Sequence, residues 1–136
     1  MINSYNSVAQ AVDSGAAYVF DTNRIVTGCT VGHTAGTATF TLNKPGYYYV
    51  TFNTTVTTET TGNVTVELQN DGVAVPGANG TETVTTAGDT KSITFATIVR
   101  VLPSCCMVDN TAKLTFVATG IALNATAANV NITKLC

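Results

Sequence analysis

The segment from Phe40 to Ala78 constrains the fold more than any other part of the chain. An alternating apolar run ends at the turn Lys44-Pro45-Gly46, and a tyrosine-rich run begins directly after it. A polar loop, a second alternating run and the turn Asn70-Asp71-Gly72 follow. Alternating runs separated by Gly, Pro, Asn and Asp are typical of antiparallel strands joined by turns. The segment therefore predicts an antiparallel all-β domain.

The longest predicted strand runs from residue 47 to 57, and alternate residues share a face. Its predicted core face holds Tyr48, Val50, Phe52, Thr54 and Val56. Further strands are predicted at 17–21, 37–43, 64–69, 82–86, 92–102, 113–118 and 129–135, while 22–36 has a loop pattern with one short strand at most. Pro76 excludes a central strand at its position, because it lacks the N–H that a ladder needs. Roughly eight to ten strands at this spacing predict a β-sandwich of two packed sheets.

Composition supports the all-β prediction and excludes several functions. The chain has 27 Thr, a β-branched residue that suits a pleated sheet. Six basic residues and a net charge of −2 leave no basic cluster for nucleic acid. No apolar run approaches the length of a membrane span. The sequence indicates no secretory signal, no nucleic-acid partner and no membrane partner.

Four cysteines, Cys29, Cys105, Cys106 and Cys136, leave several interpretations open. They are compatible with free buried thiols, or with disulfides that join Cys29 or Cys136 to one of the vicinal pair. A metal or redox role is the weakest interpretation, because no C-x-x-C occurs and the chain has one His. No cofactor is expected.

With the strands placed, several short motifs resemble the superfamily that contains TNF-like domains and complement globular heads. Residues 44–50, KPGYYYV, resemble its strand-entry motif, in which a Pro-Gly turn and one variable residue precede a core aromatic, here Tyr48. Phe20 matches an early Phe, and Phe40 and Leu42 match the apolar pair before the turn. Residues 68–78, LQNDGVAVPGA, resemble a stretch of bacterial and phage members, and residues 129–135 resemble their last strand.

The resemblance implies a jelly-roll β-sandwich that packs as a compact homotrimer. Residues 16–136 are expected to form this single domain, with residues 1–15 as an N-terminal arm or first strand region. The predicted trimer interface consists of side chains that face away from the core, and these are Tyr47, Tyr49, Ile98 and Val117. The alternative interpretation is that the chain's own loops cover them.

The resemblance also bears on function. Without a signal, stalk or collagen-like repeat, the chain fits a phage virion component best: a capsid decoration, head fibre or fibre-tip protein at the virion surface, with phage capsid or tail proteins as partners. The alternative is an adhesin tip on a bacterial cell or spore surface that binds the host surface or a glycan. Exposed Tyr with Asn and Thr favours a sugar, although Tyr residues within one strand favour packing.

Enzymatic function is not expected. His33 lies in a Gly/Thr-rich loop four residues from Cys29, without a nearby orienting carboxylate. The carboxylates form no pair at the spacing of a glycosidase motif. Some family members bind calcium, to which Asp71 or Asp109 could contribute. Asp71 otherwise suits its turn.

Overall fold

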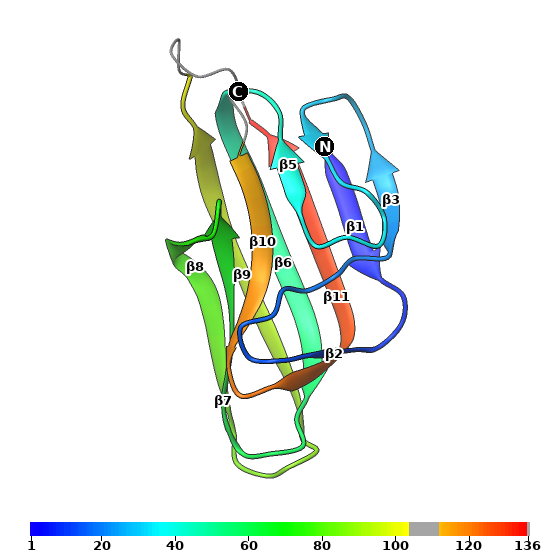
Figure 1. Cartoon of the computed structure of the whole chain (residues 1–136), viewed down its shortest axis with the longest axis vertical. Helices are drawn as coiled ribbons and strands as arrows, with labels where there is room; N and C mark the ends of the chain where they lie inside the picture. The colour runs from blue at the N-terminus through cyan, green and yellow to red at the C-terminus, as the bar shows by residue number, and fades with distance from the viewer. Residues whose placement is uncertain (104–111, 136) are drawn as a thin grey trace.

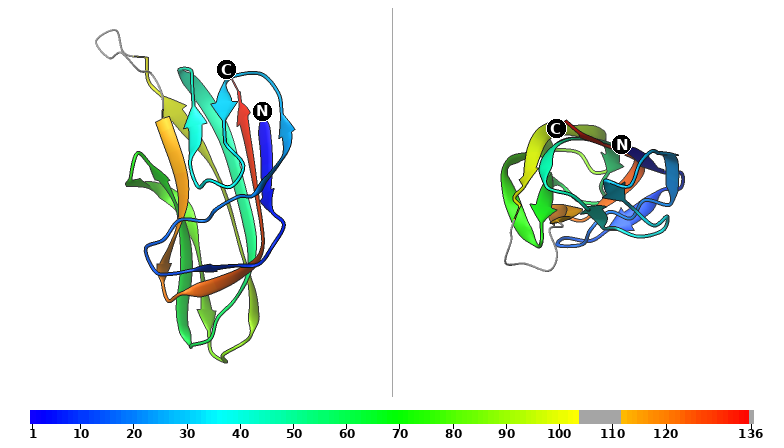
Figure 2. Two further views of the ribbon diagram at one scale, coloured as in Figure 1. Left: turned by 45° about the vertical axis from the view of Figure 1, so that its right-hand side comes forward. Right: turned by 90° about the horizontal axis from the view of Figure 1, so that it is seen from above.

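The computed structural model describes residues 1–103 and 112–135, and these form two antiparallel sheets that face each other (Figures 1 and 2). The larger sheet has the strand order β3-β1-β11-β6-β9, and β2 pairs with β11. The smaller sheet has the order β4-β5-β10-β7-β8. No helix in the described part could cross a membrane. The predicted all-β, two-sheet architecture is thus confirmed.

Eleven strands lie within the described residues, one more than the upper end of the predicted range. Those of the larger sheet are β1 (Ile2–Asn6), β2 (Gln10–Val12), β3 (Thr22–Val26), β6 (Gly46–Thr57), β9 (Thr90–Val101) and β11 (Leu123–Lys134). Those of the smaller sheet are β4 (Val31–Gly32), β5 (Phe40–Leu42), β7 (Gly62–Asn70), β8 (Val73–Val84) and β10 (Ala112–Gly120).

The N-terminal part differs from the sequence prediction. The predicted strand at 17–21 makes only isolated bridges, in which Ala17 pairs with Val117 and Phe20 with Thr37. Residues 22–36, predicted as a loop with one short strand at most, contain two short strands: β3, which pairs with β1, and β4. The pattern misled because this segment crosses between the sheets, and Tyr18 and Phe20 are buried in the core although they belong to no strand, while Val19 between them is exposed. Residues 1–15 contain β1 and β2, both part of the larger sheet.

An aromatic cluster fills the space between the sheets. The ring centroids of Phe52 on β6 and Phe116 on β10 lie 4.7 Å apart in a stacked arrangement. Other aromatic residues surround this pair, namely Tyr18, Phe20, Phe40 and Phe95. The predicted core face of the longest strand is confirmed, since all five of its residues are buried.

Buried hydroxyl groups in this core have hydrogen-bond partners. Tyr48 donates to the carbonyl oxygen of Lys44 at 2.6 Å, which ties the Pro-Gly turn to the strand that leaves it. The Tyr18 hydroxyl lies 3.2 Å from Thr54 Oγ1, and Thr54 donates to the Ala127 carbonyl oxygen. Burial raises the pKa of Tyr18 to about 12, because the phenolate is poorly solvated there.

The two sides of the sandwich differ in how much strand edge they leave unpaired. β8 and β9, each 12 residues long, are the edge strands of their sheets and run next to each other along one side. Pro76 lies in β8, in agreement with the exclusion of a central strand. On the other side the edge strands β3 and β4 are only five and two residues long. The β8–β9 side therefore offers the longer unpaired backbone.

Candidate functional site: the outer face of the larger sheet

The outer face of the larger sheet carries a cluster of exposed apolar and aromatic side chains. Tyr47 lies opposite Arg100, and Tyr49 lies opposite Ile98, on the neighbouring strands β6 and β9. Tyr47, Tyr49 and Ile98 are 41%, 42% and 55% exposed. The Arg100 guanidinium lies 5.4 Å from the centroid of the Tyr47 ring, in cation–π geometry. The structure thus brings three of the four predicted interface residues together.

A group of asparagines lies beside this cluster on the same face. Asn3 of β1 pairs with Asn131 of β11, which pairs with Thr51 of β6. The Asn3 amide donates to the side-chain oxygens of Asn129 and Asn131, and Asn131 donates to Thr51. Asn3 is only 8% exposed. These bonds connect the amides of neighbouring strands, so the face is polar without carrying charge.

The outer face is almost free of charge. The outward-facing residues of β1, β11 and β6 within the described chain are all uncharged, and β9 contributes one charge, Arg100. Arg24 lies at the margin, where its guanidinium is 4.6 Å from the Tyr5 ring centroid. The face can therefore be covered without removing many charges from water.

Val117 does not belong to this face. It lies on β10 of the smaller sheet and is 7% exposed. Ala17 bridges to Val117, and the Ala118 backbone N–H donates to the Ala16 carbonyl oxygen. The crossing N-terminal segment thus covers Val117, as in the alternative interpretation of its outward position.

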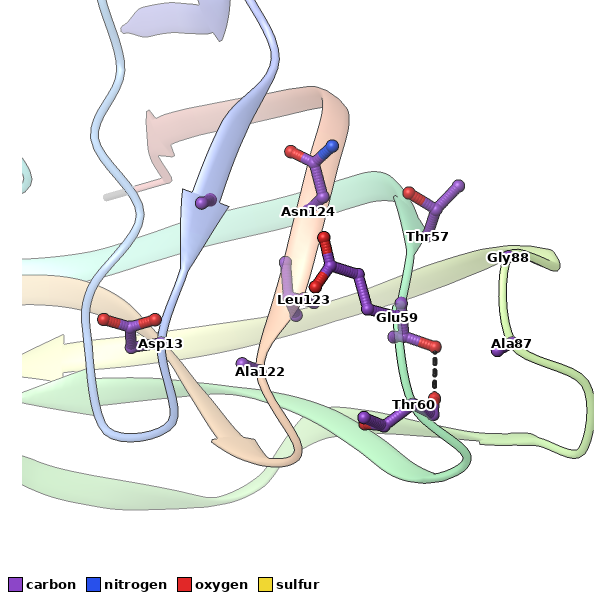
Figure 3. Close-up of a pocket in the computed structure, with 11 residues that line it drawn as sticks. Asp13, Thr57, Glu59, Thr60, Ala87, Gly88, Ala122, Leu123 and Asn124 are labelled. Carbon is purple, nitrogen blue, oxygen red and sulfur yellow. Dashed lines mark hydrogen bonds between the residues drawn. The ribbon is translucent and has the colours of Figure 1, made fainter.

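A pocket of about 780 Å³ lies at the end of the sandwich opposite the start of β1 (Figure 3). Ala11, Asn124 and Thr57 lie in one row across the larger sheet near its end, and they line one wall. The remaining lining comes from turns and loops, with Asp13, Thr58, Glu59, Thr60, Ala87, Gly88, Ala122 and Leu123. Sequence reasoning missed this pocket, because its walls come from four separate segments.

The His33 ring makes packing and hydrogen-bond contacts with neighbouring segments of the fold. Its ring stacks on Phe40 at a centroid distance of 4.2 Å, and Nε2 donates to the Thr37 carbonyl oxygen at 2.8 Å. Nδ1 lies 2.6 Å from Oδ1 of Asn23 on β3. The ring therefore links the β4–β5 connection to the edge of the larger sheet. Cys29 is exposed.

The His33 environment has a measurable consequence. Burial lowers the pKa of His33 below its usual value of about 6.5, and the hydrogen bond to Thr37 opposes this effect. The neutral ring is favoured in the folded state, so its contribution to stability is present above pH ~6.5 and declines as the pH falls. We expect NMR titration of the single His to give the lowered pKa. A His33→Gln variant should lose this part of the pH dependence of unfolding, and an unshifted or raised pKa would contradict the expectation.

Two acidic residues, Asp71 and Asp109, were candidates for a calcium site. Asp71 occupies the β7–β8 turn with φ 51°, and its carboxylate accepts a hydrogen bond from the Lys113 backbone N–H. Asp109 lies outside the described residues, as do Cys105, Cys106 and Cys136. Within the described part, no group of three or more His, Cys, Asp or Glu residues is placed to hold a metal ion.

Comparison with solved structures identifies the fold. Murine APRIL, in a crystal structure at pH 5.0, matches with a TM-score of 0.65 and 10% identity, over 98% of this chain and 97% of that one. The PRD1 vertex protein P5 matches with a TM-score of 0.53 and 18% identity, over 99% and 96%. No family model matches the sequence, and no curated protein matches it significantly.

The fold is thus a TNF-like jelly roll, as the sequence motifs predicted. The likeness extends over nearly the whole chain, including the N-terminal strands, and its neighbours include both an animal protein and a phage vertex protein. At these identities the likeness concerns the fold, and function has to be argued from the surfaces of this chain.

Proposed function

We propose that this chain is a non-enzymatic structural protein that assembles as a homotrimer through the outer face of its larger sheet. The observation that carries the proposal is the exposed cluster of Tyr47, Tyr49 and Ile98 on a face that has almost no charge. In its assembled form the protein displays a binding surface on a phage virion, as a capsid decoration, head fibre or fibre tip.

The chemistry of the face suits burial against protein. Interface cores are depleted in charged residues and enriched in Tyr and Arg. Covering exposed apolar area stabilises an assembly by roughly 25 cal/mol per Å² before the costs of association are subtracted. Arg100 already stacks on Tyr47, so its charge is partly accommodated by the aromatic ring.

The unpaired side of the sandwich suggests what covers this face. The long edges of β8 and β9 expose backbone groups along one side, and natural proteins cover such edges. In the proposed trimer, the β8–β9 side of one copy packs on the outer face of the next. Such a head-to-tail contact generates a closed ring when the rotation between copies closes, here after three copies.

The phage assignment is supported by the fold likeness to the PRD1 vertex protein P5, which spans both chains almost completely. Its name identifies that protein as a vertex protein of PRD1. We propose a corresponding place at the virion surface for this chain, with capsid or tail proteins as attachment partners. A host-surface or glycan-binding tip is the second candidate, and the pocket in Figure 3, which Thr57, Glu59 and Asn124 help to line, favours it.

The mass in solution tests the assembly. Light scattering should give three times the chain mass of 14.1 kDa. Ile98→Lys should shift the mass toward that of one chain, because it places a second cation beside Arg100 on the buried face. Val8→Lys is the matched control, since Val8 is 68% exposed in the connection between β1 and β2 and lies outside both this face and the β8–β9 side. A wild-type mass of one chain, or an Ile98→Lys variant that keeps the trimer mass, would contradict the proposed interface.

A further inference from the structure

The free edge of β9 is a long, regular array of backbone donors and acceptors. β9 pairs with β6 along its whole length without a register shift, and no strand of the described chain pairs with its other edge. β8 offers a poorer edge, because Pro76 has no N–H and the β7–β8 register shifts between Glu67 and Gln69. β8 comes close to β9 at Gly80, where an added Cβ would lie 2.6 Å from Ile93 Cγ2. The inference therefore concerns the part of the β9 edge beyond this contact, toward the end of the strand.

The asparagine group lies in register with this part of β9 but on the other side of the face. One row of paired residues crosses the sheet, and it consists of Asn3 on β1, Asn131 on β11, Thr51 on β6 and Ala96 on β9. β6 separates the asparagines from β9 in the sheet order (Figure 1). The β9 edge of the same chain therefore cannot reach these amides, whereas the edge of a second copy placed on the face can.

The hydrogen bonding of this asparagine group is incomplete within one chain. Asn3 is 8% exposed and donates to Asn129 and Asn131, but its Oδ1 is buried and has no hydrogen-bond partner among the described residues. Asn129 Oδ1 accepts from both of the other amides, while its own amide nitrogen donates to no group in the described part. Buried polar groups in native proteins are nearly always paired, so the missing partners point to a molecule outside the chain.

Asparagine amides and a strand edge are chemically matched. An Asn side chain carries one carbonyl acceptor and an NH₂ donor, and an unpaired edge presents the same two groups, C=O and N–H. Both partners are uncharged, so their contact can be buried without removing a charge from water. Copies in a closed ring are related by rotation alone, so with the axis along the strands the row of one copy meets the same row of the next. The side chain in that row on β9 is Ala96, whose single methyl group allows a close approach.

We propose that the amides of Asn3, Asn129 and Asn131 bind the β9 backbone edge of a second copy of this chain near Ala96, and that these bonds fix how the copies align. The inference rests on the proposed homotrimer and identifies the groups of the two copies that meet. The exposed cluster of Tyr47, Tyr49 and Ile98 supplies apolar area, which has little directional preference. Hydrogen bonds between amides and a strand edge are directional, so they select one register among those that the apolar contact allows.

Replacing the amides by an apolar side chain tests the proposal through the sign of the effect. Asn131→Val and Asn129→Val should each raise the protein concentration at which half of the trimer dissociates by at least about tenfold, because backbone groups of the neighbouring edge lose their partners. Sedimentation equilibrium over a dilution series measures this, and circular dichroism checks the fold. Asn63→Val is the matched control, since Asn63 is exposed on the smaller sheet and likewise accepts a cross-strand bond, from Thr83. Unchanged or tighter association of both Val variants on the larger sheet would overturn the proposal, because amides that are merely buried should gain from the replacement.

Hydrogen exchange shows whether the β9 edge is the group that the amides bind. In the wild-type trimer, backbone amides in residues 96–101 should exchange at least about tenfold more slowly than in Asn131→Val diluted until it dissociates. Residues 50–55 of β6, which pairs on both edges, are the internal reference and should keep their protection. Equal exchange of residues 96–101 in the two samples would reject the edge as the partner. A wild-type mass of one chain would reject the assembly and this contact together, whereas a trimer that Ile98→Lys disrupts and both Val variants leave intact would reject this contact alone.

Discussion

Phe116→Ala is expected to lower the free energy of unfolding by about 3–5 kcal/mol. Phe116 is fully buried on β10 of the smaller sheet, where its ring stacks on that of Phe52 from the larger sheet. It also contacts aromatic rings from three further segments, those of Phe20, Phe40 and Phe95. Removing the ring leaves a cavity that the surrounding strands cannot close, because their ladders hold them in place.

Urea unfolding followed by circular dichroism measures this effect, at a fixed protein concentration because assembly adds to apparent stability. Phe116→Leu should cost less, since it keeps part of the apolar volume. Thr115→Ala, on the same strand but with its side chain on the opposite face, is the position control. A loss below about 1 kcal/mol for Phe116→Ala would show that the aromatic cluster does not hold the two sheets together.

Gly120→Ala is expected to cost about 2–3 kcal/mol, for two separate reasons. Gly120 has φ +84°, a left-handed conformation that disfavours a side chain by about 1–2 kcal/mol. An added Cβ would also lie 2.4 Å from the Asn63 carbonyl oxygen, which accepts a hydrogen bond from the Ile121 N–H. Relief of this contact moves that carbonyl and weakens the bond that links β7 to the end of β10.

Gly15→Ala separates the two causes. Gly15 has nearly the same φ, +86°, but no atom lies within 4 Å of the position of an added Cβ. Its substitution should therefore show the backbone cost alone, and the difference between the two variants measures the steric contact with Asn63. Equal losses for the two variants would show that the Asn63 carbonyl moves aside without cost.

Local sequence patterns predicted the central strands well. In the 47–57 strand, alternate apolar residues mark the buried face, and the structure buries every one of them. The same reasoning failed at residues 17–26, where the apolar segment crosses between sheets and the polar segment forms β3. Alternating apolar residues indicate which side chains are buried. Buried side chains mark a strand only where the segment runs along a sheet.

Two apolar residues at outward positions show why the sequence alone could not predict which residues of the candidate interface are exposed. Ile98 and Val117 are both apolar residues at outward positions of their strands, so sequence treats them alike. Ile98 is exposed beside Tyr49, whereas Val117 is covered by the segment around Ala17. That segment is about 100 residues away in sequence, so local periodicity contains no information about it.

The sequence by itself determined the class of the fold and its core, because side-chain alternation and turn residues act between near neighbours along the chain. The motifs around residues 44–50 and 68–78 also indicated the TNF-like jelly roll that the structure shows. Only the tertiary structure decided which outward side chains are exposed, which sheet edges are left unpaired and where a pocket forms. Each of these depends on contacts between segments that are distant in sequence, and the pocket that combines Asp13, Glu59 and Asn124 exists only once those segments meet.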